Sequence, residues 1–152
     1  MDFLRPRLDH VHISKICPHN PSQSVFIPFF DIRIPAGFPS PADDYLDHAL
    51  DLNDLLIEHP VATFYVRVQG DSMEGAGIHS GDILVVDRAL EPRHSHIVVA
   101  VMDGEFTIKR LWIEGNTVRL VAENRTMRPL EITEDTRFEV WGVVTYAIHP
   151  IK

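Results

Sequence analysis

The sequence has few of the features that mark secreted or membrane-bound proteins. It contains one cysteine, Cys17, so no disulfide can form within the chain, and a reducing, cytoplasmic compartment is expected. The longest uninterrupted apolar run, residues 97–102, is far shorter than the roughly 18–20 residues of a membrane-spanning helix. The amino-terminal stretch has no long apolar segment of the kind found in secretory signals. We therefore expect neither export nor a membrane partner.

Basic residues are also scarce. The formal net charge is −8, with 14 Lys and Arg against 22 Asp and Glu. A protein that grips the phosphate backbone usually presents a face rich in Lys and Arg. No helix-turn-helix pattern is visible near the amino terminus either. Direct, sequence-specific DNA binding is therefore not expected, and the acidic charge favours protein partners.

The 152 residues suffice for one domain, preceded by an arm. Residues 1–24 contain three prolines and no sustained hydrophobic period, which is typical of a loose arm. Residues 24–34 are rich in aromatic and β-branched side chains and predict an extended segment. Pro28 and Pro35 confine that segment to a sheet edge or a docked position. Residues 36–41, Ala-Gly-Phe-Pro-Ser-Pro, form a break in regular structure.

One stretch has helical spacing. Residues 43–59 carry leucines that suit one helix or two consecutive helices, and Pro60 ends the pattern. Asp51 is a suitable N-cap for the second part, because its carboxylate can accept backbone N–H groups.

The remainder of the chain predicts a mainly β fold. Short β-branched or aromatic runs bounded by turn residues occur at 63–69, 83–87, 96–102, 105–112, 117–122 and 137–148. Asp103-Gly104 between two of them is a strong two-residue hairpin signal. Six short strands with hairpins indicate a compact, barrel-like β domain with a short helix and an extended amino-terminal arm.

Ser72 is a candidate nucleophile. It follows the expected strand 63–69 in a stretch rich in glycine, where a turn can expose the hydroxyl. Such a turn can also aim nearby backbone N–H groups at an oxyanion. The alternative is a serine in an ordinary strand-to-loop turn.

Lys109, within the expected strand 105–112, is a candidate base for that serine. A lysine on a strand usually faces solvent. To accept a proton it must be neutral, which requires burial to lower its pKa by about 3 units from roughly 10.4. Because an acidic protein favours the charged form, local desolvation has to prevail.

Other catalytic or metal arrangements fit less well. Ser72 lies in Gly-Asp-Ser-Met-Glu, which lacks the second glycine of the Gly-x-Ser-x-Gly elbow. His79 could pair with Ser72, but its place in a glycine-rich loop leaves its position undetermined. His94 and His96 alternate on an expected strand edge, yet no cysteine or third histidine stands at a suitable spacing. We therefore expect no metal and no cofactor.

Taken together, these residues resemble those of UmuD-like proteins in the self-cleaving LexA/UmuD peptidase family of the bacterial SOS response. The resemblance extends from about Phe26 to Val144. Its motifs include Ala36-Gly-Phe-Pro-Ser-Pro41, Asp51-Leu-Asn, Leu55-Leu-Ile, His59-Pro60, Gly70-Asp-Ser-Met73, Gly81-Asp82, Val86-Asp87, Gly104-Glu-Phe-Thr-Ile-Lys109 and Trp141-Gly-Val-Val144. The resemblance implies a LexA/UmuD-like catalytic domain.

The resemblance also implies a reaction. Neutral Lys109 would take the proton of Ser72, whose oxygen would attack the carbonyl of Ala36. Backbone N–H groups of Asp71 and Ser72 would form the oxyanion hole, and the amine of Gly37 would leave. The chain would thus divide into an arm, residues 1–36, that self-cleavage removes, and a Ser/Lys peptidase-like β domain, residues 37–152.

Partners follow from the same resemblance. A RecA filament on single-stranded DNA would stimulate cleavage, and the product would serve a Y-family, UmuC-like polymerase subunit in translesion synthesis. A homodimer is expected. Residues 26–30 fall where these proteins place an apolar segment associated with the polymerase sliding clamp, although simple packing on the body is the favoured interpretation.

Two other functions remain open. One is a non-cleaving regulatory module that binds a polymerase or the clamp. The other is cleavage of separate proteins, as in signal peptidases. The sequence also departs from the family at Ser95-His96, where a Gly-Asp pair is usual, and this departure puts the geometry of that turn in question.

Overall fold

The computed structural model describes residues 12–18, 26–30 and 46–152. Within them, residues 12–18 and 59–152 form one compact unit, and residues 26–30 and 46–58 form a second. The fold is mainly β, as predicted. No helix in these ranges is long and apolar enough to cross a membrane.

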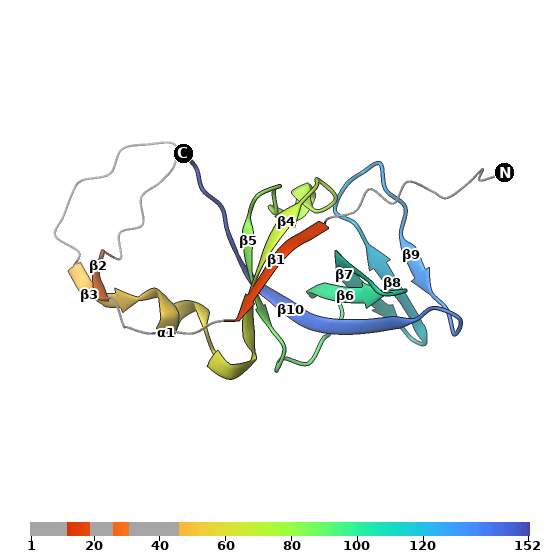
Figure 1. Cartoon of the computed structure of the whole chain (residues 1–152), viewed down its shortest axis with the longest axis horizontal. Helices are drawn as coiled ribbons and strands as arrows, with labels where there is room; N and C mark the ends of the chain where they lie inside the picture. Colours follow the sequence, from red (N-terminus) through yellow and green to blue (C-terminus); the bar gives the residue numbers. More distant parts are fainter. Residues whose placement is uncertain (1–11, 19–25, 31–45) are drawn as a thin grey trace. The chain divides into compact units, whose positions relative to one another are not determined.

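The larger unit is built on one antiparallel sheet of eight strands in the order β1-β4-β5-β10-β6-β7-β8-β9 (Figure 1). Their bounds are β1 His12–Pro18, β4 Thr63–Gln69, β5 Ile83–Asp87, β6 Ile97–Met102, β7 Glu105–Glu114, β8 Thr117–Val121, β9 Leu130–Ile132 and β10 Phe138–Ile148. Two 3-10 turns, η1 Pro60–Ala62 and η2 Glu74–Ala76, flank β4. All six strands expected after residue 60 are present.

Two strands of this sheet were not anticipated. β9 has only three residues, too few to show an alternating pattern. β1 lies within the segment expected to be a loose arm, so that expectation is wrong for residues 12–18. β1 pairs with β4 along its length, and its register shifts between Ile13 and Lys15. This irregularity interrupts the period of two on which strand prediction depends.

The smaller unit corrects the helix prediction. Residues 46–51 form strand β3, Leu46–Asp51, which pairs with β2, Phe26–Phe30, so only Leu52–Leu56 is helical, as α1. Pairing with a distant strand outweighed the local leucine spacing. Asp51 is the N-cap of α1, as predicted, and its carboxylate accepts the backbone N–H of Asn53 at 2.9 Å.

The main sheet is covered on both faces. Val98 and Val99 are adjacent on β6 and fully buried, yet they belong to different hydrophobic clusters. Adjacent strand residues point to opposite faces, so both faces are apolar. The first cluster includes Met73 and Ile78, which lie in the connection between β4 and β5. The core therefore holds that connection, which also carries Ser72.

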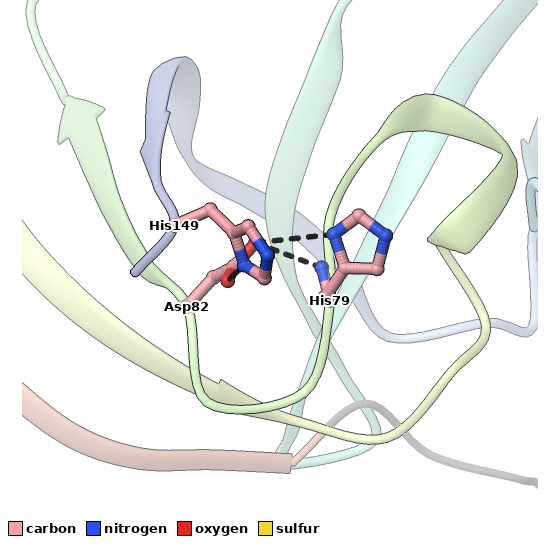
Figure 2. A group of neighbouring side chains, drawn as sticks. All are labelled: His79, Asp82 and His149. Carbon is pink, nitrogen blue, oxygen red and sulfur yellow. Dashed lines mark hydrogen bonds and ion pairs between the residues drawn. The ribbon is translucent and has the colours of Figure 1, made fainter. Parts of the chain in front are cut away.

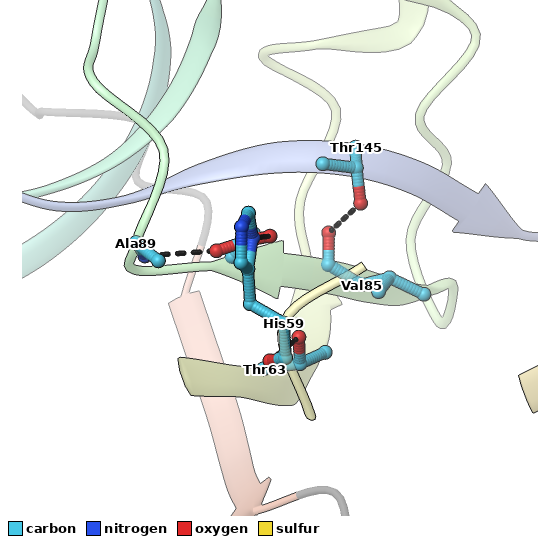
Figure 3. Close-up of polar contacts among 6 residues, drawn as sticks. His59, Thr63, Val85, Ala89 and Thr145 are labelled. Atoms are coloured by element: carbon cyan, nitrogen blue, oxygen red, sulfur yellow. Dashed lines mark hydrogen bonds and ion pairs between the residues drawn. The ribbon is translucent and has the colours of Figure 1, made fainter. Parts of the chain in front are cut away.

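A polar cluster secures the end of β5 (Figure 3). The buried carboxylate of Asp87 accepts the backbone N–H of Ala89 at 2.8 Å and lies 2.6 Å from Nδ1 of His59. Nearby, the β5–β10 register shifts between Val144 and Tyr146, and the hydroxyl of Thr145 donates to the carbonyl of Val85. These contacts hold β5 against its neighbours.

Candidate active site

The connection between β4 and β5, residues 70–82, carries the candidate nucleophile, and we call it the serine loop. Glycines at its bends take left-handed backbone angles, with φ of +106° at Gly70, +79° at Gly77 and +94° at Gly81. Residues with a Cβ rarely adopt these angles. Met73 and Ile78 anchor the middle of the loop in the core. The glycines noted in the sequence therefore shape a compact loop rather than a flexible one.

Ser72 and Lys109 meet in this structure. Nζ of Lys109, on β7, lies 3.1 Å from Oγ of Ser72 in a hydrogen bond. Ser72 is fully buried, and Lys109 is partly buried. Register places Lys109 opposite Val98 of the central strand β6, so its backbone position is determined by the sheet. The distance allows direct proton transfer between hydroxyl and amine.

The surroundings of Lys109 favour its neutral form. Burial lowers the pKa of the Lys109 ammonium, because a desolvated cation loses the stabilisation that water provides. This is the direction that a lysine base requires. Despite the acidic character of the chain, desolvation is the dominant influence on this group.

A second set of contacts ties the serine loop to the segment after β8. The backbone N–H of Gly75 donates to the carbonyl of Glu123 at 2.8 Å. The side chain of Glu123 forms an ion pair with Arg110, the neighbour of Lys109 on β7. Glu123 thus links the serine loop and the lysine strand. Sequence reasoning missed it, because a lone glutamate after a strand carries no recognisable signal.

Comparison with known proteins identifies the family. The family model described as Peptidase S24-like matches residues 28–145. The chain belongs to this family. Ser72, Lys109 and Glu123 all lie within the matched range of this S24-like chain.

Comparison with individual relatives supports the same family assignment. The chain is 46% identical to Protein ImpA of Salmonella typhimurium over 138 residues, covering 87% of the chain and 91% of ImpA. It is 45% identical to Protein MucA of Escherichia coli over 128 residues, covering 82% of the chain and 87% of MucA. The LexA repressor of Ectopseudomonas mendocina is 41% identical over 100 residues, covering 66% of the chain and 48% of the repressor. The resemblance to UmuD-like proteins of the LexA/UmuD family is thereby confirmed.

In this S24-like protein, the groups expected to form the oxyanion hole lie in the serine loop. The carbonyl of Asp71 accepts the backbone N–H of Glu74 at 3.2 Å and an amide hydrogen of Asn124 at 3.4 Å. Among the hydrogen bonds between described residues, the backbone N–H groups of Asp71 and Ser72 are not donors. Their role as an oxyanion hole stays a prediction.

The histidines considered in the sequence lie elsewhere. His79 contacts Asp82 and His149. His94 packs edge-on against Trp112 and accepts the backbone N–H of Ile113. Among the described residues, the hydroxyl of Ser72 is hydrogen-bonded to Lys109 and to neither of these histidines. His94 and His96 precede β6 instead of alternating along it, so that part of the expectation is wrong.

The expected cleavage site, Ala36-Gly37, lies outside the described residues. The expected division of the chain into residues 1–36 and 37–152 therefore stays a prediction from the sequence alone.

Proposed function

We propose that this S24-like chain is a serine endopeptidase that cleaves its own Ala36–Gly37 bond and acts in SOS mutagenesis. The observation that carries the proposal is the 3.1 Å contact between Ser72 Oγ and Lys109 Nζ. It joins a buried hydroxyl to an amine whose pKa is lowered by burial. The relatedness to ImpA, MucA and LexA supports the same assignment.

The reaction follows from these positions. Neutral Lys109 accepts the Ser72 proton as Oγ bonds to the carbonyl carbon of Ala36, and the resulting oxyanion is stabilised by the N–H groups of Asp71 and Ser72. When the C–N bond breaks, the protonated Lys109 returns its proton to the departing amine of Gly37. Lys109 then removes a proton from water, which attacks the acyl-enzyme and releases the carboxylate of Ala36. Ser72 regains its proton from Lys109.

Cleavage acts as a switch in this proposal. The arm, residues 1–36, is removed, and the β domain, residues 37–152, becomes the accessory subunit of a Y-family, UmuC-like polymerase. A RecA filament on single-stranded DNA stimulates the cut by favouring the docked bond or the neutral lysine. The active form is a homodimer. Before cleavage, residues 26–30 pack on the body, and they are also the candidate segment for contact with the sliding clamp.

Intact-mass spectrometry tests the chemistry. The purified full chain is incubated at about pH 10, where a lysine with a lowered pKa is largely neutral. The wild type is compared with Ser72→Ala and Lys109→Ala. We expect a product that begins at Gly37 in the wild type only.

Two matched variants sharpen the result. Ser80→Ala removes another hydroxyl of the serine loop, one that accepts the Gly70 N–H. His79→Ala removes the competing base. Both variants are expected to cleave. Loss of cleavage in His79→Ala would instead assign the base to histidine.

A second candidate function is a regulatory binding module without cleavage. It would be favoured if the wild type stays uncut with RecA, nucleotide and single-stranded DNA. Cleavage of other proteins is tested separately: a free peptide spanning residues 34–41 is offered to residues 37–152. Turnover of that peptide would show that the site accepts outside substrates.

A further inference from the structure

A group of three potential metal ligands lies outside the Ser72–Lys109 pair. His79 and Asp82 belong to the end of the serine loop, and His149 follows β10 (Figure 2). One ligand atom from each residue lies within 4.8 Å of the other two. The carboxylate of Asp82 is fully buried, whereas the side chains of His79 and His149 are 46% and 42% exposed.

The carboxylate lies between the two imidazoles. Nδ1 of His149 is 2.6 Å from Oδ1 of Asp82, and Nδ1 of His79 is 3.8 Å from Oδ2. The two rings are tilted by 38°, with centroids 4.7 Å apart. Zinc bonds of about 2.0–2.2 Å at a tetrahedral angle place two ligand atoms roughly 3.4 Å apart. The two observed separations, one to each carboxylate oxygen, lie on either side of that value.

The backbone around the ligands is already ordered. The carboxylate of Asp82 accepts the backbone N–H of His79 at 2.8 Å, and the backbone N–H of Asp82 donates to the carbonyl of His79 at 3.1 Å. Two backbone hydrogen bonds with Val68 of β4 hold the same turn. The N–H of Gly81 donates to the carbonyl of Val68, and the N–H of Val68 donates to the carbonyl of Asp82. A carboxylate oriented by a backbone N–H is the support that metal sites commonly have.

The third ligand is positioned by the sheet. Ile148, the residue before His149, pairs with Ile83, the residue after Asp82. His149 and Asp82 are thus brought together by the register of β10 with β5. Nothing in the sequence spacing indicates this, because 67 residues separate them.

We propose that His79, Asp82 and His149 bind one Zn²⁺ ion, with water at the remaining position. Two imidazoles and one carboxylate form a donor set that zinc uses in proteins, and nitrogen and oxygen donors suit it better than Mg²⁺ or Ca²⁺. The ion would clamp the end of the serine loop to the end of β10. This site is independent of the proposed self-cleavage.

Zinc binding is tested with the full chain after a chelator has removed bound metal. Zn²⁺ is titrated against a chromogenic chelator, and thermal unfolding is followed with and without Zn²⁺. We expect one site in the wild type and a rise in the melting temperature, because the ion binds the folded state. His79→Ala/His149→Ala should bind Zn²⁺ at least about 100-fold more weakly, since even outer partners of a metal site contribute roughly 10–100-fold.

The matched control is His94→Ala/His96→Ala, which removes two histidines from the turn before β6. It should retain wild-type zinc affinity and the rise in melting temperature. Because the side chains of His79 and His149 are 46% and 42% exposed, we expect the double variant to fold, and circular dichroism checks this. Equal zinc binding by the two double variants, or no binding by the wild type, would overturn the proposal.

Discussion

Lys109 Nζ lies 3.1 Å from Ser72 Oγ, although 37 residues separate them in the sequence. One group comes from a loop anchored in the core and the other from a central part of the sheet. Both are therefore held by elements that pack extensively, and the pair does not depend on a flexible segment. Preorganisation of this kind reduces the cost of bringing base and nucleophile together.

The rate of self-cleavage should rise with pH and then reach a plateau. Only neutral Lys109 can accept the Ser72 proton, and burial lowers the pKa of Lys109 below its ordinary value. The midpoint is therefore expected below about 10.4. The single-turnover rate, measured by intact mass between about pH 6 and 11, checks this. A flat profile across that range would contradict a lysine base.

The stability of the fold should depend on the same group. The lowered pKa of folded Lys109 means that the unfolded chain binds more protons between the folded and unfolded pKa values. Stability therefore rises as pH increases through that window. In a Ser72→Ala background, adding Lys109→Met should raise the free energy of unfolding at pH about 7. This gain over Ser72→Ala alone should shrink towards pH about 10. Urea unfolding at both pH values measures this difference. Tyr65, whose pKa is raised by burial, is present in both variants, so its titration cancels when they are compared.

Gly75→Ala should disturb the serine loop. A Cβ at this position would lie 2.6 Å from the carbonyl oxygen of Glu123, so the loop and the segment after β8 must separate. We expect a loss of about 1–3 kcal/mol of stability and slower self-cleavage. Gly115→Ala is the matched control: its Cβ meets nothing within 4 Å, and only its φ of +56° is unfavourable. It should lose about 1 kcal/mol and keep its cleavage rate. Equal cleavage rates in both variants would refute this role of the Gly75 contact.

Ser95→Gly should stabilise the protein. Ser95 has φ of +70°, the left-handed region that favours glycine, at a position where the resemblance to the family leads us to expect Gly. Glycine relieves the strain of the positive φ, but its greater freedom in the unfolded chain offsets part of this effect. We therefore expect the free energy of unfolding to rise by about 0.5–1 kcal/mol. Ser95→Ala, which keeps the strained φ, should show no gain. Thermal or urea unfolding compares the two, and a less stable Ser95→Gly would be the contrary result.

Cleavage at Ala36–Gly37 should loosen β1. The strand lies on the amino-terminal side of the cut, yet it pairs with β4 in the main sheet. Once the covalent link is gone, a seven-residue edge strand is held only by its pairing, without the benefit of high effective concentration. Hydrogen exchange in β4 should therefore increase after cleavage and dilution, while β6 stays protected. Unchanged exchange in β4 would mean that the arm remains bound.

The sequence by itself predicted most of the sheet. Strands β4 and β5 were predicted with their observed bounds, since short runs rich in β-branched residues between clear turn signals indicate strands, whether partly exposed like β4 or buried like β5. The turn at Asp103-Gly104 was also correct, and both residues have positive φ. Residues 46–51 were assigned to a helix because leucine spacing is local, whereas their partner strand β2 is remote in the chain.

The sequence also named Ser72 and Lys109 as a pair, through residue types and resemblance to a family. Only the tertiary structure could place the amine beside the hydroxyl, because that distance depends on how β7 packs against the serine loop. The links through Glu123 and the His79–Asp82–His149 group likewise appear only in three dimensions. Local patterns identified most of the strands, whereas long-range pairing decided that residues 46–51 form a strand and determines which side chains meet.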